Sequence, residues 1–413
     1  KKKMNEMSET VNADFWKNRR VWVVWIGIFI ASLTWRLFLI GKYPIVYSFD
    51  AFIRIWDADE LFVRHWLPLP HLPIMFAHAA GLGLKTLRYF FAFFSAASIV
   101  TIGIAISRIY RTHLLGVTGA LLIGSLGNYI VWSVVPYQEG LMFTFLGLFL
   151  MFSPYVHDNL PDRFYWTAGI FLMMASLCRY EVWILTVIIL IRFLYTRRFR
   201  IVLSLLPGLI IPVIWVVIYQ FVDVHTGPPR SEHALEPINL ATLSDPGTIV
   251  KLSSGVLVRA FSEMVEDLGW IGALILPVGI LFSLRNSCRW GRELVIFWAA
   301  LAGLVFVRGI NSHGVLTMRM FVPLNVIAVI LSTEFFYAAG GYLRHRSFIL
   351  REFLPAMAVV AVCTAWLMRG YYLVGQYSYA YVHEAIAARL LESVPEGEKE
   401  RQRTARCSTW MNA

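Results

Sequence analysis

Long apolar runs alternate with short polar segments along nearly the whole chain, and this pattern predicts a bundle of membrane-spanning helices. A spanning helix needs about 20 mostly apolar residues, and within lipid the backbone must satisfy its own hydrogen bonds. Eleven runs approach this length, near residues 21–41, 89–107, 114–135, 140–154, 164–178, 182–195, 201–222, 268–284, 293–310, 320–340 and 353–369. We therefore predict an all-α polytopic membrane protein with about 11 transmembrane helices.

The polar segments predict one orientation of the chain in the membrane. Cytoplasmic loops carry an excess of Lys and Arg, and the basic segment 1–20 is expected to stay in the cytoplasm. Alternation from there places the remaining basic segments on the same side: "SRIYRTH", "HDNLPDR", "TRRFR", "RNSCRWGR" and "LRHRSF". If the short stretch 69–85 crossed completely, the later basic loops would face outward. We expect that stretch to form a re-entrant or interfacial helix.

This orientation also predicts the domain organisation. Residues 21–370 are expected to form one transmembrane domain, with outer loops at 42–88 and 223–266. Residues 371–413 are expected outside the membrane on the outer face, as an amphipathic helix near 382–394 followed by a polar tail. The sequence therefore indicates a multi-pass membrane protein.

Composition supports this class and excludes several others. Apolar residues make up 58% of the 413 positions and charged residues only 15%, with a mean hydropathy of +0.62, so lipid must cover much of the surface. The net charge of +11 does not indicate nucleic-acid binding, because the basic residues lie in short loops between apolar runs. The four cysteines are far apart and have no nearby histidine partners, which indicates neither a metal site nor a disulfide framework.

Charged residues of both signs gather on the predicted outer face. Ionisable groups at membrane depth are costly and usually serve a site or an ion pair. The candidates come from separate segments, and we expect them to line one water-accessible cavity: Asp50, Arg54, Asp57, His71, Tyr137, Glu139, Arg179, Glu181 and Arg319.

The first outer loop contains the densest group of these residues. In a helix beginning near Asp50, positions 50, 54 and 57 share one stripe, so Arg54 can pair with Asp50, four residues earlier. Apolar residues between them suit a helix that lies along the membrane surface. The plainer interpretation is a solvated amphipathic helix whose charges pair with each other.

The other candidates also have plain structural interpretations. Glu139 can complement the dipole of the helix that it begins, and Arg179 with Glu181 can form an ion pair in a tight hairpin. Arg319 can extend from a span end to the membrane surface, and His71 can be a hydrogen-bonded structural histidine. A divalent cation is an open alternative, although no calcium-binding loop spacing occurs. The convergence on one face is stronger evidence than any single residue.

The order of segments resembles the GT-C glycosyltransferases, specifically relatives of protein O-mannosyltransferases and aminoarabinose transferases. The resemblance rests on one span, an outer loop with a membrane-level Asp, "WLPLPHLP", two further spans, "PYQEGLMF" and "CRYEVW", and it covers roughly residues 20–200. It implies transfer of a sugar from a polyprenyl-phosphate carrier to a glycan, lipid or protein acceptor at the outer face of a bacterial or archaeal cytoplasmic membrane. The usual adjacent Asp-Glu pair is replaced here by "FDAF".

The resemblance assigns roles to individual residues. Asp50 matches the loop acid by position and is predicted to be the general base, with Asp57 as its competitor. The leaving phosphate needs cationic stabilisation, which Arg179 and Arg319 can supply through bidentate contacts. Three rival functions stay open: a transporter or flippase for polyprenyl-linked sugars, a glycan ligase, and a non-catalytic assembly subunit.

Overall fold

The structure is a computed structural model, and within the residues it describes the regular elements are all helices, as predicted. It describes residues 19–43, 51, 54–55, 58, 67–110, 112–153, 162–226, 254–259, 261–262, 265, 277–281, 284, 289–311, 321–343 and 354–392. The named helices are α2 (Arg19–Lys42), α4 (Leu72–Ala79), α5 (Leu84–Tyr110), α6 (His113–Ser125), α7 (Gly127–Ser133), α8 (Glu139–Phe152), α9 (Asp162–Ser176), α10 (Glu181–Tyr195), α11 (Phe199–Leu205), α12 (Pro207–Thr226), α14 (Arg289–Asn311), α15 (Val322–Leu343) and α16 (Leu354–Glu392).

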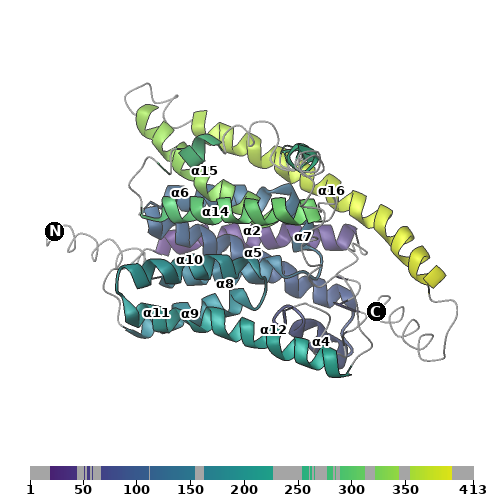
Figure 1. Ribbon diagram of the computed structural model, residues 1–413. Coiled ribbons are helices and arrows are strands. Elements are labelled where there is room, and N and C mark those ends of the chain that lie inside the picture. Colours follow the sequence, from purple (N-terminus) through teal and green to yellow (C-terminus); the bar gives the residue numbers. More distant parts are fainter. Residues whose placement is uncertain are drawn as a thin grey trace.

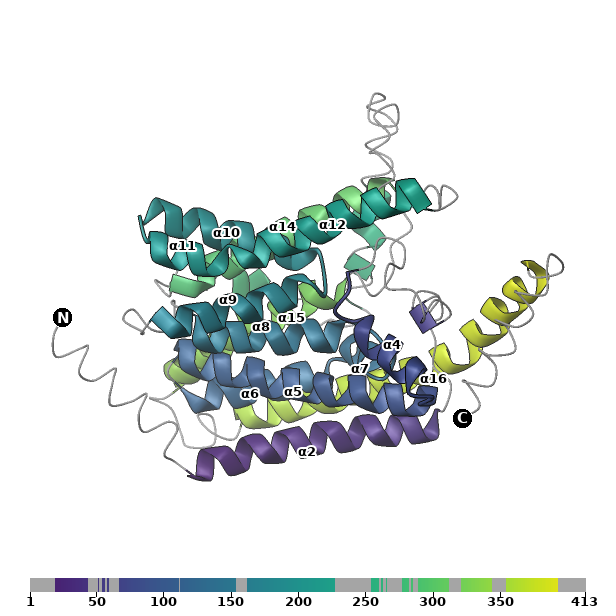
Figure 2. The ribbon, with the colours of Figure 1, turned by 90° about the horizontal axis from the view of Figure 1, so that it is seen from below.

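The long helices lie side by side in layers (Figures 1 and 2). On one side of the molecule α2 packs against α5, and α5 packs against α6 and α8. The stack continues from α8 to α9, which contacts α11 and α12. A second group completes the bundle: α14 packs against α15, α15 contacts α6, and α16 covers α6 and α7. The core therefore runs through the layer of α5 and α8.

Small residues bring α8 close to α5. A Cβ atom on Gly140 would lie 2.2 Å from Ser95 Oγ, and one on Gly147 would lie 2.4 Å from Thr101 Oγ1. Between these contacts the Thr144 hydroxyl donates a hydrogen bond to the Phe94 carbonyl (2.7 Å). Close approach through small residues is how membrane helices gain packing contacts. The start of α8, which carries Glu139, is thus fixed against α5.

The predicted spans coincide with helices, but the number of membrane crossings is confirmed only in part. In the described part of the chain four helices are long and apolar enough to cross, namely Arg19–Lys42, Leu84–Tyr110, Phe199–Ile218 and Ala356–Gln376. The pair α6 and α7, bent by 68° at Leu126, makes a fifth if it is one span. The apolar helices Glu139–Phe152, Glu293–Val307 and Val322–Thr333 are shorter. The predicted number of about eleven stays a prediction.

The predicted re-entrant stretch forms a short helix followed by a tight turn. Eight residues make up α4, which corresponds to a length of about 12 Å and is too short to cross a bilayer. Gly81, with φ of +64°, ends the helix before α5 begins. Its placement relative to the membrane is not tested, so a re-entrant position stays a prediction.

Other predicted segments are seen only in part. The span at 268–284 is described only at 277–281 and 284, and the outer loop at 223–266 is described at its two ends. The tail helix expected at 382–394 is the end of α16, which is continuous to Glu392 and extends beyond the helical layers (Figure 2).

Candidate active site

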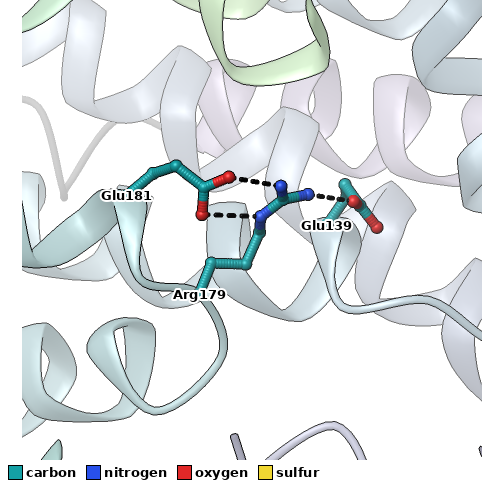
Figure 3. A network of polar contacts seen from close by, with 3 residues as sticks. All are labelled: Glu139, Arg179 and Glu181. Atoms are coloured by element: carbon teal, nitrogen blue, oxygen red, sulfur yellow. Dashed lines mark hydrogen bonds and ion pairs between the residues drawn. The ribbon is translucent and has the colours of Figure 1, made fainter. Parts of the chain in front are cut away.

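An ion-pair network joins three of the predicted site residues (Figure 3). The Arg179 guanidinium contacts Glu181 through two nitrogens, with Nε donating to Oε2 at 2.9 Å and Nη2 donating to Oε1. Its third nitrogen, Nη1, pairs with the Glu139 carboxylate. Glu139 is 0% exposed, Arg179 is 7% exposed and Glu181 is 19% exposed. The hairpin ion pair that the sequence suggested therefore exists, and it extends to a carboxylate 40 residues away.

The local fold explains why these charges meet. Glu139 is the first residue of α8 and Glu181 is the first residue of α10. A helix N-terminus carries partial positive charge and stabilises a nearby carboxylate. Arg179 lies in the turn between α9 and α10, so its guanidinium reaches both helix starts. The result is a buried cluster in which one cation is shared by two carboxylates.

Arg54 and Cys178 border this cluster. Arg54 lies in the segment between α2 and α4 and is 1% exposed, and with Ala51, Ile55 and Ala58 it forms a buried set at helical spacing. The buried Cys178 thiol feels the charges of Arg54, Glu139 and Arg179. The thiol is therefore within electrostatic range of all three charged groups, and Arg54 adds a second cation to the site.

His71 and Tyr137 lie in buried segments close to the same place. The turn that contains His71 is joined to the α9–α10 turn, because the Leu69 N–H donates to the Leu177 carbonyl (3.4 Å). His71 is 2% exposed. Tyr137, also buried, packs edge-to-face on Trp132 with ring centroids 5.2 Å apart. The structure thus gathers Arg54, His71, Tyr137, Glu139, Arg179 and Glu181 near one end of the bundle.

The three remaining predicted site residues, Asp50, Asp57 and Arg319, lie outside the described residues. Their predicted roles are therefore not tested. Among the residues that are described, no group of three or more His, Cys, Asp or Glu side chains is placed to hold a metal ion.

Two buried arginines near the site were missed by the sequence reasoning. Arg88, 0% exposed, donates from Nε to the Val134 carbonyl (2.7 Å) and from Nη1 to the Tyr43 carbonyl (2.8 Å). It thereby holds the loop before Glu139 against the end of α2. In the sequence Arg88 directly precedes the predicted span 89–107.

The second missed residue is Arg36, which is fully buried within α2. Its Nη1 donates to the Ser32 hydroxyl (2.6 Å), and its guanidinium carbon lies 5.7 Å from the centre of the Tyr129 ring. The Tyr129 hydroxyl in turn hydrogen bonds to Ser98. A single charge inside an otherwise apolar span is the signal that could have identified Arg36.

An apolar cavity of about 470 Å³ lies between α4, α5 and α8. Its lining is almost wholly apolar: Leu69, Leu72, Pro73, Phe76, Ala77, Leu82, Thr86, Leu87, Phe90, Phe94, Leu141 and Phe145. Leu72, Phe76 and Phe90 are exposed, so the cavity reaches the outer surface of the bundle. Leu69 belongs to the turn bonded to the α9–α10 turn, and Leu141 lies two residues after Glu139. The cavity lining and the charged cluster therefore share the first turn of α8 and the pair of bonded turns.

The comparisons with known proteins find no matching family model and no matching curated sequence, but solved structures match over nearly the whole chain. One is the archaeal oligosaccharyltransferase AglB from Archaeoglobus fulgidus in complex with an inhibitory peptide and a dolichol-phosphate, with a TM-score of 0.52 and 15% identity over 91% of this chain. The chain spans 58% of the length of that structure.

The other is ArnT from Cupriavidus metallidurans bound to undecaprenyl phosphate, with a TM-score of 0.53 and 14% identity over 90% of this chain and 81% of that one. Both are membrane glycosyltransferases of the GT-C fold. At this level of identity the likeness establishes the fold alone. The chain therefore has the GT-C fold that its sequence resemblance predicted.

Proposed function

We propose that this chain is a membrane glycosyltransferase that moves a sugar from a polyprenyl-phosphate donor to an acceptor at the extracytoplasmic face. The observation that carries the proposal is an apolar cavity whose lining shares the first turn of α8 with a buried charged cluster. A donor of this class has an apolar chain, which gains free energy on leaving water, and an anionic head, which needs cationic partners. Both solved structures of the same fold contain a polyprenyl phosphate or dolichol-phosphate, which supports this choice of ligand.

In this proposal the polyprenyl chain occupies the cavity between α4, α5 and α8, and the phosphate points toward Arg179. Arg179 already contacts two carboxylates, so the phosphate competes with one of them. Glu181 is the more exposed of the two and is the one expected to yield. Arg54, which is buried beside the cluster, and Arg319 supply further positive charge.

The transfer itself needs one base. We assign that role to Asp50, because it is the first carboxylate after the first span and lies four residues before Arg54. Asp50 takes the proton of the acceptor hydroxyl, the acceptor oxygen bonds to the anomeric carbon, and the bond from that carbon to the phosphate oxygen breaks. Polyprenyl phosphate leaves with the bonding electrons. Asp57 is the competing candidate for the base.

The acceptor class stays open among a glycan, a lipid and a protein. The size of the transferred group is also open, since one of the two solved structures is an oligosaccharyltransferase. A glycan ligase is therefore the second candidate function. A flippase would need the same phosphate contacts but would leave the donor chemically unchanged.

The experiment is incubation of the purified protein in detergent with a panel of polyprenyl-phosphate sugars and candidate acceptors, followed by chromatography of the donor. Consumption of at least one donor, with release of polyprenyl phosphate, supports a transferase. Recovery of every donor intact would reject it.

A cavity variant tests the assigned binding mode. Thr86→Trp places a large ring in the cavity from an exposed position on α5, and we expect the KM for the donor to rise at least tenfold. Tyr89→Trp is the matched control, because Tyr89 is exposed on the same helix and does not line the cavity. Equal KM values for the two variants would place the polyprenyl chain elsewhere.

A further inference from the structure

The turn between α10 and α11 holds an arginine in a backbone conformation that usually belongs to glycine. α10 ends in a Schellman motif, in which the Arg198 N–H donates to the Phe193 carbonyl (2.9 Å) and the Arg197 N–H donates to the Leu194 carbonyl (3.0 Å). Arg197 therefore adopts φ of +54°. A residue with a Cβ atom is disfavoured there, so the backbone alone does not explain an arginine at this position.

A second helix of the same chain shows the usual solution. α4 ends with the same pair of hydrogen bonds, from the Leu82 N–H to the Ala77 carbonyl (2.8 Å) and from the Gly81 N–H to the His78 carbonyl (3.0 Å). There the left-handed position is Gly81, with φ of +64°. Any advantage of arginine over glycine at position 197 must therefore come from the side chain.

The surroundings of Arg197 are those of a membrane surface. The candidate span Phe199–Ile218 begins two residues after it. Tyr195 is 88% exposed and Phe199 is 60% exposed, and aromatic side chains of this kind gather at the level of lipid headgroups. Arg197 and Arg200 are exposed between and beside them. The turn therefore presents guanidinium groups flanked by apolar rings.

The charge of Arg197 is not neutralised by a neighbour within the described part of the chain, where its guanidinium has no hydrogen-bond or ion-pair partner. At the same end of the bundle, the Glu293 carboxylate is paired with Arg192, which precedes Arg197 by five residues and belongs to α10. The turn lies at the end of the bundle opposite to α4 (Figure 2), away from the candidate active site. Its function is therefore separate from the glycosyl transfer proposed above.

We propose that the α10–α11 turn binds the headgroup of an anionic phospholipid. The planar guanidinium of Arg197 matches a lipid phosphodiester with two parallel hydrogen bonds, and Arg200 adds a second positive charge. Tyr195 and Phe199 contact the glycerol and upper acyl region. An Arg near the surface of an anionic membrane contributes enough attraction to change lipid affinity about fivefold.

The test compares the wild-type protein with Arg197→Gly in neutral detergent. Native mass spectrometry measures retention of added phosphatidylglycerol and phosphatidylcholine, and thermal denaturation is followed without lipid. We expect the wild type to prefer phosphatidylglycerol and the variant to bind it about fivefold more weakly, with phosphatidylcholine unchanged. Because glycine suits this φ, the lipid-free variant should melt no earlier than the wild type.

Four results would overturn the proposal. One is a wild-type protein without preference for phosphatidylglycerol, and another is an Arg197→Gly protein that keeps the preference. The third concerns Arg163→Gln, a control that removes an exposed arginine at the start of α9 and should change binding less than about twofold. An equal loss in that control would mean diffuse attraction rather than a site. Stabilisation by inorganic phosphate equal to that by the lipid would also count against a headgroup site.

Discussion

Removal of the Arg179 side chain tests how the buried charged cluster is held together. Arg179→Met leaves Glu139, which is 0% exposed, without its ion-pair partner. Breaking a buried pair from one side costs about 3–5 kcal/mol, and the N-terminus of α8 offsets up to about 1 kcal/mol of it. We therefore expect Arg179→Met to lower the free energy of unfolding by about 2–4 kcal/mol.

A double variant at positions 139 and 179 measures the interaction energy between the two side chains. Glu139→Gln alone gives up a charged hydrogen bond, about 1.5–3 kcal/mol, while Glu139→Gln with Arg179→Met leaves no unpaired charge at position 139. The double variant should therefore be more stable than the sum of the single effects predicts, by at least about 1.5 kcal/mol.

The assay is reversible unfolding by SDS in mixed micelles, followed by far-UV circular dichroism. Arg163→Met at an exposed site is the control and should change stability by less than about 0.5 kcal/mol. A coupling energy between positions 139 and 179 below about 0.5 kcal/mol would refute the reasoning, because the two side chains would then act independently.

Three further predictions concern the frame of the site. Arg88→Leu leaves the Val134 and Tyr43 carbonyls without their guanidinium donor and should lower the free energy of unfolding by about 2–4 kcal/mol in the same assay. A loss below about 1 kcal/mol would mean that water replaces the guanidinium. The Cys178 thiol is 2% exposed, so peptide mapping should show its alkylation by maleimide only after denaturation. Single cysteines at positions 198 and 233 should react with an impermeant maleimide from the cytoplasmic and outer sides respectively, and the reverse pattern would invert the proposed topology.

The helices were predictable because each apolar run must form a helix in lipid, and nearly every predicted span overlaps one. The bend at Leu126 was not predictable in this way. The predicted span 114–135 runs through the bend, although Gly124, Ser125, Gly127 and Asn128 surround it. The break lies where α7 turns to pack on α16, with Gly127 against the backbone of Gly370. Periodicity reports local structure and carries no information about such a tertiary contact.

In the candidate site, too, local sequence predicted some features and tertiary contacts decided the others. Sequence reasoning found Arg179 and Glu181 because they are two residues apart, and it placed Glu139 on the same face through the alternation of spans. It could not find that Arg179 is shared with Glu139, since that contact joins residues 40 positions apart. Arg36 and Arg88 were missed because their partners are mainly backbone carbonyls, a hydroxyl and an aromatic ring, so no residue of opposite charge marks them in the sequence, although Arg36 stands alone in an apolar span.

Turnover of a polyprenyl-phosphate sugar by Asp50→Asn tests the central claim most directly. Asparagine keeps the size of the side chain but cannot take the acceptor proton, and loss of a general base costs about 10²–10⁴ in rate. We predict that fall in kcat with donor binding retained, while Asp57→Asn stays within about tenfold of wild type. Near-normal turnover by Asp50→Asn, with or without loss of activity in Asp57→Asn, would contradict the assignment of Asp50 as the base.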